Sequence, residues 1–380
     1  MNKHLDALIA IPSVSGGEQK SIMYIKHMLD TLHVLSWTID GNIVAHIAGK
    51  NTHHAVIFDV HVDTVSPGTL SAWKTDPFQA VHKNGKVYGL GASDEKAAVA
   101  TLLVLVGSYV KKQPACDVYF FFVTKEEVDG SGSKTLVSWF MKHKKKKYAH
   151  VGAILGEPTD LKTIEIAHKG NIFLKVTTHG DSGHGACPDK ITTHAVAQMM
   201  KASSKLYTLG KQWKKNYGDP VLGTPTIGHL TSIIAGSGLA PNKFPDTCVA
   251  TFDIRTTPGL HAYALAQAKD CLDGLATVSL VSAPGLCGYT DAAYPFVQMA
   301  KKMVTKARIQ ASDWSSDLCF FTKAHIPAIV FGPGNKACMH KPNEYCTEKN
   351  IARCVTHYTK MVEQFVLVYA HPCRETKFLL

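Results

Sequence analysis

The sequence predicts an α/β fold into which a smaller α+β domain is inserted. The chain has 380 residues, more than one hydrophobic core usually holds. Its first half repeats a buried strand followed by a polar loop, which is typical of an α/β sheet. After about residue 170 the order of strands and helices changes. We therefore expect one discontinuous domain over residues 1–168 and 283–380 and an inserted domain over residues 169–282.

Residues 57–65, with the sequence IFDVHVDTV, predict a buried strand at the centre of the first domain. The run is largely apolar, and many of its residues are β-branched or aromatic. Side chains two residues apart share one face of a strand, so His61 and Asp63 would emerge side by side near its end. This pair suits a metal-binding histidine oriented by an acid, although a hydrogen-bonded histidine is the commoner case at a strand end.

The elements before and after this strand follow from periodicity and turn residues. They are a helix over about 18–32, short strands near 34–39 and 43–48, a hairpin turn at 83–86, and a buried helix over about 94–109. Asp94 stands where this last helix starts, so it is also a candidate helix N-cap. The next expected elements are strands over 118–123 and 151–155, a strand over 320–331, and a final helix over 347–369.

Acidic and histidine side chains follow these strands. Glu126 and Glu127 come after strand 118–123, and Glu157 comes after strand 151–155. Ligands of α/β sheets bind outside the carboxyl ends of the strands, so these residues are candidates for a site. By itself, the pair Glu126 and Glu127 also fits a solvated loop.

The inserted domain has its own order of elements. We expect a strand over 171–179, a helix over 191–209, strand-like sequence over 223–255 around Gly236-Ser237-Gly238, a helix over 260–273 and a strand over 276–281. The order β-α-β-β-α-β predicts a ferredoxin-like antiparallel sheet covered by two helices.

The polar residues at the strand ends form a candidate metal-binding set. It comprises two histidines and several carboxylates but no cysteine: His61, Asp63, Asp94, Glu126, Glu127, Glu157 and His340. Such a set suits zinc, or manganese or cobalt in competition. It has too many ligands for one tetrahedral ion and enough for two ions that share a carboxylate.

Six ordered motifs carry a resemblance to a known family. They are GLGASDEK at 89–96, KEE at 125–127, GEPT at 156–159, HKG at 168–170, GHGACP at 183–188 and the stretch from Gly332 to Tyr345. The chain resembles the di-zinc amidohydrolases and peptidases that include acetylornithine deacetylase and succinyl-diaminopimelate desuccinylase. The regions 156–170 and 332–345 are most similar to acetylornithine deacetylase. The resemblance implies a catalytic domain with a mixed sheet flanked by helices.

The resemblance also implies the role of each residue. His61, Asp94 and Glu157 would bind one zinc ion, and Asp94, Glu127 and His340 the other. Asp63 would orient His61, and Glu126 would be the general base. A cis peptide after Asp94 is frequent in the family. In place of the common sequence Asp-Met-Lys-Gly-Gly, this chain has Asp94-Glu95-Lys96-Ala97-Ala98, which places an acid beside the shared ligand.

The inserted domain resembles the lid and dimerisation domain of the family, which implies a homodimer. His184 matches a histidine that reaches a neighbouring active site and stabilises the oxyanion. Asn242 and Arg255 match positions that hold the carboxylate of the substrate. His184 in an exposed turn and Arg255 in a plain salt bridge are the simpler interpretations. Cys187 as a nucleophile is disfavoured because the sequence indicates no activated thiolate there, although His184 lies three residues before it.

Composition excludes several classes of protein. The net charge of +11 comes partly from lysine runs at 142–147 and 211–215 that lack nucleic-acid-binding motifs, so we expect no nucleic-acid partner. No apolar run is long enough to span a membrane. The N-terminus lacks a signal peptide, and ten scattered cysteines indicate reduced thiols in the cytoplasm.

The expected function is hydrolysis of the amide bond of a small N-acyl amino acid, such as N-acetylornithine in arginine biosynthesis. A metal-activated hydroxide would be the nucleophile, and Glu126 the general base. The alternatives are a dipeptidase, a carboxypeptidase or a desuccinylase of the same family, and a catalytically silent metal-binding or ligand-binding protein.

Overall fold

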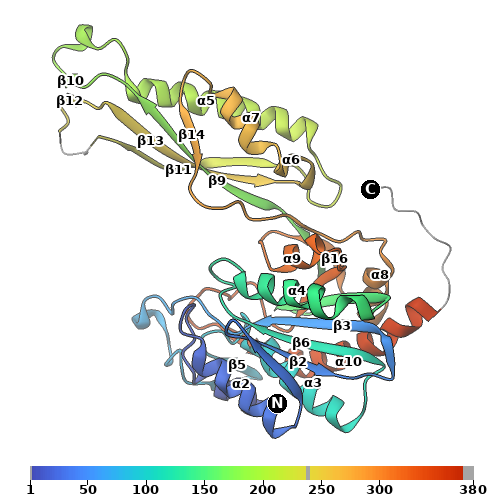
Figure 1. The fold of residues 1–380 in the computed structure, drawn as a ribbon. Coiled ribbons are helices and arrows are strands. Elements are labelled where there is room, and N and C mark those ends of the chain that lie inside the picture. Colours follow the sequence, from blue (N-terminus) through green and yellow to red (C-terminus); the bar gives the residue numbers. More distant parts are fainter. Residues whose placement is uncertain (1, 237–239, 371–380) are drawn as a thin grey trace. The chain divides into compact units, whose positions relative to one another are not determined.

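The computed structural model describes residues 2–236 and 240–370. Ser237 and Gly238, which the sequence places within a strand-like stretch, lie outside these residues. The chain divides into two compact units (Figure 1). Of the described residues, the first unit comprises 2–166, 289–310 and 316–370, and the second comprises 167–236, 240–288 and 311–315.

The first unit holds most of the helices and the larger sheet. Its helices are α1 (Asn2–Ile9), α2 (Gln19–Thr31), α3 (Lys96–Lys111), α4 (Ser131–His143), α8 (Pro295–Met303), α9 (Leu318–Lys323) and α10 (Glu348–Ala370). Its main strands are β1 (Leu35–Ile39), β2 (Asn42–Ile47), β3 (Asn51–His61), β6 (Cys116–Val123), β7 (His150–Pro158), β8 (Thr163–His168) and β17 (Ala328–Gly332). Shorter strands are β4 (Val81–Lys83), β5 (Lys86–Tyr88), β15 (Gly288–Tyr289), β16 (Arg308–Ser312) and β18 (Tyr345–Thr347).

The large sheet is mixed, as the family resemblance implies. Its strands follow the order β1-β2-β6-β3-β7-β17-β8-β15, and β16 pairs with β8 as well. The central pairs β6-β3, β3-β7 and β7-β17 are parallel, whereas β1-β2, β2-β6 and β17-β8 are antiparallel. The four parallel strands therefore end at one edge of the sheet, where ligands of α/β proteins bind.

Helices cover both faces of this sheet, so its central strands are apolar on both sides. In Figure 1, α4 lies on one side of β3 and β6, and α3 and α10 lie on the other. Ile57 belongs to the core that includes Leu136 and Phe140 of α4. Phe58, the next residue of β3, faces the other way and has its ring centroid 4.7 Å from that of Tyr358 in α10. Burial on both faces explains the continuous apolar sequence of this strand.

Several sequence-based boundaries need correction. The central strand begins at Asn51 and ends at His61, so Asp63 lies in the loop that follows. The expected strand over 320–331 is wrong in its first half, because Leu318–Lys323 forms α9 and only Ala328–Gly332 is a strand. Phe321 and Leu318 both pack in the core, and a run of buried apolar residues does not by itself separate a helix from a strand.

The second unit is a four-stranded antiparallel sheet covered by helices on one face. Its elements are β9 (Gly170–His179), β10 (Gly183–His184), α5 (Ala195–Asn216), β11 (Thr226–Ala235), β12 (Lys243–Phe244), β13 (Thr247–Thr256), α6 (Pro258–His261), α7 (Ala264–Cys271) and β14 (Thr277–Leu280). The strand order is β11-β13-β9-β14. Alternate residues of β13, such as Phe252 and Ile254, pack against Leu206 of α5. The expected helix over 260–273 is two short helices.

Asp117 stabilises the large sheet at a point distant from the candidate site. Its buried carboxylate accepts hydrogen bonds from Gly49 N (2.9 Å), Lys147 Nζ (2.7 Å) and the Tyr148 hydroxyl (2.7 Å). Burial opposes the charged form, but these donors and His46 together hold the pKa of Asp117 well below its usual range. The folded state therefore keeps the carboxylate ionised where the unfolded chain takes up a proton.

We expect Asp117→Asn to lower the free energy of unfolding of the metal-free protein by about 1–3 kcal/mol at pH 7, because a buried donor loses its acceptor. The unfolded carboxyl titrates near pH 3.9 and the folded one below that. The stability that Asp117 contributes is thus present at neutral pH and is lost as the pH falls. Urea unfolding at pH 7 and pH 3.5 should show the difference from wild type shrinking by about 0.7 kcal/mol. A difference that grows at low pH would contradict this assignment.

Candidate metal centre

The candidate site lies at the edge of the large sheet where its parallel strands end. His61 is the last residue of β3, and Glu157 is the next-to-last residue of β7. Glu126 and Glu127 follow the end of β6. Because β3 pairs in parallel with both β6 and β7, their carboxyl ends bring these side chains to one place.

Two groups of potential ligands share Asp94. The first is His61, Asp94 and Glu157, and the second is Asp94, Glu127 and His340; within each group the ligand atoms lie within 4.8 Å of one another. The two oxygens of Asp94 face different histidines. Oδ1 lies 3.1 Å from His61 Nε2, and Oδ2 lies 3.2 Å from His340 Nε2. The structure thus brings together all five residues that the resemblance implies as ligands.

One side of this cluster is open to solvent. The side chain of His61 is 1% exposed and that of Asp94 is 4% exposed, whereas the His340 side chain is 43% exposed. His340 Nε2 also lies 3.0 Å from Glu127 Oε1. A small molecule can therefore approach the second ligand group, while the first lies deeper in the protein.

Glu344 fixes the loop that carries Asp94, a role that was not predicted from the sequence. Its buried carboxylate accepts the backbone N–H groups of Gly91 (2.8 Å), Ser93 (2.7 Å) and Asp94 (2.8 Å). Burial and the nearby charge of Asp94 raise the pKa of Glu344 to about 7, against the effect of these donors. The only indication of this role in the sequence is that Glu344 stands four residues after the candidate ligand His340. The peptide bond from Asp94 to Glu95 is cis, as the resemblance implies.

Asp63 contacts both the ring of His61 and the loop that follows β6. The ring Nδ1 of His61 lies 3.0 Å from the backbone carbonyl oxygen of Asp63 and 3.5 Å from its carboxylate. That carboxylate accepts hydrogen bonds from Ser15 Oγ (2.7 Å) and from the backbone N–H groups of Glu126 and Glu127 (both 3.2 Å). Burial opposes its ionisation, but His61, the Ser15 hydroxyl and the Glu127 N–H together lower the pKa of Asp63. One carboxylate therefore holds both the β3 loop and the β6 loop.

The carboxyl groups of the site resist ionisation where no cation balances them. Burial is the main cause that raises the pKa of Glu126 and Glu157 well above the usual range, and neighbouring carboxylates add to it. Asp94 differs, because hydrogen bonds from His340 and His61 outweigh its burial and hold its pKa well below the usual range.

The neighbouring carboxylates raise the pKa values of the two histidines of the site, because they stabilise the protonated rings. Hydrogen bonds to Asp94 and Glu127 raise the pKa of His340 to about 10. Burial would lower the pKa of His61, but Glu95, Asp63 and Asp94 together raise it well above its ordinary value. The surrounding carboxylates thus favour a positive charge at both rings, as they would favour a bound cation.

This donor set fits divalent metal ions. It offers imidazole nitrogens and carboxylate oxygens and no thiolate, which suits zinc, cobalt or manganese at a catalytic site. Closely spaced buried acids gain most from a nearby positive charge. Sharing Asp94 lets the five residues hold two such ions.

The second unit places its three sequence-predicted residues in two different places. His184, on the short separate β10-β12 pair, has Nε2 3.4 Å from Nδ2 of Asn242, the residue just before β12. Arg255 lies near the opposite end of β13, roughly 26 Å along the strand from Thr247. Its guanidinium pairs with Asp253 at 2.9 Å. Within one chain, therefore, Arg255 does not join His184 and Asn242.

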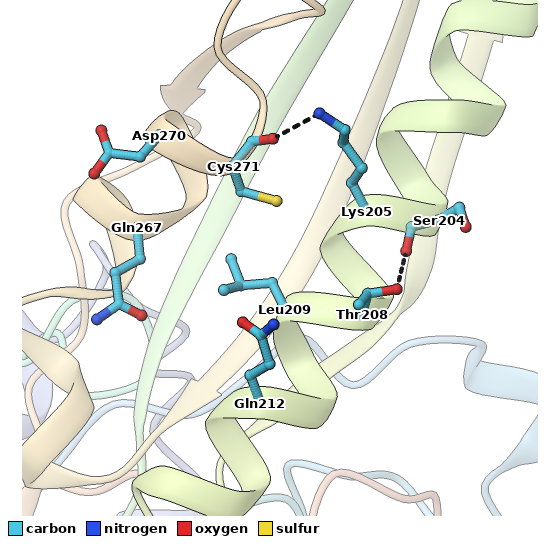
Figure 2. A pocket seen from close by; sticks show the side chains of 8 residues that line it. All are labelled: Ser204, Lys205, Thr208, Leu209, Gln212, Gln267, Asp270 and Cys271. Atoms are coloured by element: carbon cyan, nitrogen blue, oxygen red, sulfur yellow. Dashed lines mark hydrogen bonds between the residues drawn. The ribbon is translucent and has the colours of Figure 1, made fainter.

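A shallow groove of about 490 Å³ lies between α5 and α7 of the second unit (Figure 2). Lys205 Nζ donates to the carbonyl oxygen of Cys271 across it at 3.4 Å. The remaining lining residues are Ser204, Thr208, Leu209, Gln212, Gln267 and Asp270. This lining has one carboxylate and no histidine, so the groove lacks the metal-binding chemistry found at the sheet edge.

The fold and the paired ligand groups are those of a metal-dependent hydrolase. The chain belongs to the peptidase family M20/M25/M40, whose profile matches residues 57–364. This membership confirms the family resemblance of the sequence motifs. The chain is similar to the acetylornithine deacetylase of Proteus mirabilis, with 28% identity over 383 residues that cover 95% of each protein.

Solved structures show the same fold. Aminopeptidase PepT from Bacillus cereus matches with a TM-score of 0.77 and 17% identity, covering 96% of this chain and 98% of PepT. The YXEP protein of Bacillus subtilis, described as a dinuclear metal-binding peptidase of the M20 family, matches with a TM-score of 0.70 and 13% identity, covering 97% of this chain and 98% of YXEP.

Proposed function

We propose that the protein hydrolyses the amide bond of a small N-acyl amino acid of the N-acetylornithine type. The observation that carries the proposal is Asp94, whose two oxygens lie 3.1 Å and 3.2 Å from the nitrogens of two different histidines. This arrangement supports two divalent ions that share one carboxylate. Similarity to an acetylornithine deacetylase over 95% of the chain favours an N-acyl amino acid as substrate.

The ligand groups would hold two zinc ions per subunit, with cobalt or manganese as possible replacements. Bound divalent ions supply Lewis-acid polarisation of a carbonyl oxygen and make water more acidic. Glu126 stands beside the ligands with its backbone held by Asp63. Its burial and raised pKa suit a group that takes a proton near neutral pH and then returns it to the leaving amine.

We assign substrate contacts to the second unit. His184 and Asn242 lie close together on an exposed strand pair, where they would reach the substrate of a second copy in a homodimer. The edge strand β11 supports such an assembly, because it exposes Ile233 and Ile234. Arg255 would bind a carboxylate only after exchanging its partner Asp253.

Two further observations bear on where the enzyme works. The nine cysteines of the described residues are unpaired, which supports a reducing compartment such as the cytoplasm. Among the same residues, no helix combines the length and apolar character needed to cross a membrane.

Activity assays on matched substrates test the proposal. The protein loaded with zinc or cobalt should hydrolyse N-acetylornithine at least about tenfold faster, by kcat/KM, than N-succinyl amino acids or dipeptides. A preference for dipeptides would favour the second candidate, a dipeptidase or carboxypeptidase, which the name of the family supports. A fully loaded protein that hydrolyses none of these substrates would be a metal-binding or ligand-binding protein, and the proposal would fail.

A further inference from the structure

Glu95 is a buried acid of the metal centre that belongs to neither ligand group. It lies between Asp94 and the start of α3, and it is 1% exposed. Its Oε1 lies 4.0 Å from His61 Nε2, a separation similar to the 3.9 Å between Glu157 Oε1 and the same nitrogen. Glu95 therefore forms part of the wall around His61.

The Glu95 carboxyl also binds the backbone of His61. Its Oε1 accepts the N–H of His61. The N–H of the next residue, Val62, donates instead to the carbonyl oxygen of Val123, which follows the pairing of β3 with β6. Because N–H groups point alternately to the two sides of a strand, the N–H of His61 points toward β7.

Within the described part of the chain, strand pairing supplies no acceptor for the His61 N–H on the β7 side. The register of β3 with β7 ends at Asp59 and Leu155, two residues before His61. A buried N–H without an acceptor is unfavourable, and native structures nearly always satisfy such groups. The Glu95 side chain supplies the acceptor at the point where the strand pairing stops.

Gly156 leaves the space that Glu95 occupies. A Cβ atom at this position would lie 3.1 Å from Glu95 Oε2, 2.7 Å from the Cβ of Ala98 and 2.6 Å from Cγ1 of Val60. Each of these distances is shorter than an ordinary van der Waals contact. A glycine at 156 therefore lets β3, α3 and the Glu95 side chain pack closely together at this point.

We propose that Glu95 is a positioning residue for the ion that His61 and Glu157 would bind. One side chain links the strand that carries His61 to the loop that carries Asp94, so it fixes two ligands of the same ion relative to each other. The link acts through hydrogen-bond geometry at the His61 backbone. This inference rests on the metal centre of the proposed function.

Two conservative variants separate geometry from charge. Glu95→Gln keeps the length of the side chain and an acceptor oxygen but removes the acidic group, whereas Glu95→Asp keeps the acidic group and is one methylene too short. We expect Glu95→Asp to weaken the binding of one of two zinc ions by about tenfold or more, as is usual when a residue that orients a ligand is lost. Glu95→Gln should stay within about threefold of wild type.

Zinc affinities are measured by competition with a chromophoric chelator on the full chain, and the cobalt-substituted proteins are compared by absorption spectroscopy. Only Glu95→Asp should change the cobalt spectrum.

Asp117→Asn is the matched control, because Asp117 is a buried acid that accepts a backbone N–H on another part of the sheet. It should leave both zinc affinities unchanged even where it lowers stability.

Two results would overturn the inference: Glu95→Asp with both affinities unchanged, or Glu95→Gln weakened as much as Glu95→Asp. A wild-type protein that binds no zinc, cobalt or manganese would instead sink the proposed metal centre. The two failures are therefore distinguishable in one set of titrations.

Discussion

Glu126→Gln should reduce kcat by about 10²–10⁴-fold while both metal ions stay bound, because an amide cannot accept the proton that the carboxylate takes. Glu126 belongs to neither ligand group, so its loss should not release metal. Glutamine keeps the size of the side chain, and the backbone hydrogen bond from residue 126 to Asp63 does not depend on it. Single-turnover kinetics together with metal analysis of the purified variant measure both quantities.

Asp129→Asn is the matched control for this variant. Asp129 is an exposed acid in the same loop, and its side chain accepts the backbone N–H of Ser131 at 2.9 Å, which an asparagine oxygen can also do. This variant should keep the activity of the wild type. If Glu126→Gln retained near-normal turnover with full metal content, Glu126 would not be the base.

The second large effect concerns the shared ligand. Asp94→Ala should lower the metal content from two ions to fewer than one per chain, because each ligand group loses a member at once. The loss of activity should exceed the roughly 100-fold expected for a residue that only orients a ligand. Glu344 binds the backbone N–H of residue 94, so the loop should keep its position when the side chain is shortened.

His340→Ala provides the comparison. His340 occurs in only one ligand group, so this variant should lose one ion and keep the other. Metal analysis after dialysis against a fixed free zinc concentration distinguishes the two variants. Equal metal losses in Asp94→Ala and His340→Ala would contradict the sharing of Asp94.

The sequence predicted the mixed α/β fold well, because its signals are local. The run from residue 116 to residue 123 is buried throughout, and the strand prediction is confirmed there. The hairpin at 83–86 is confirmed as well, with positive φ at Asn84 and Gly85 as that turn requires. The segment 318–323 was wrongly predicted to be part of a strand, because a short run of buried apolar residues has no periodicity that distinguishes a strand from a helix.

The candidate site was foreseen as a set of residues, not as a geometry. Order along the chain and the types of side chain indicated two metal ions, but each acid alone fitted a cap or a loop. Asp63 was expected to orient His61 with its carboxylate. In the structure that carboxylate lies 3.5 Å from His61 Nδ1, and it also accepts the backbone N–H groups of Glu126 and Glu127.

By itself, the sequence determined which ligand atoms are available: nitrogen and oxygen atoms at strand ends, and a further glutamate, Glu95, beside Asp94. It also determined the apolar runs that build the sheet. Only the tertiary structure decided how they combine. The two oxygens of Asp94 face different histidines, and Glu344 comes from 250 residues away to hold its backbone. Glu95 completes β3 where pairing with β7 stops. Such hydrogen bonds depend on where separate strands end, and strand pairing between distant segments leaves no local pattern in the sequence.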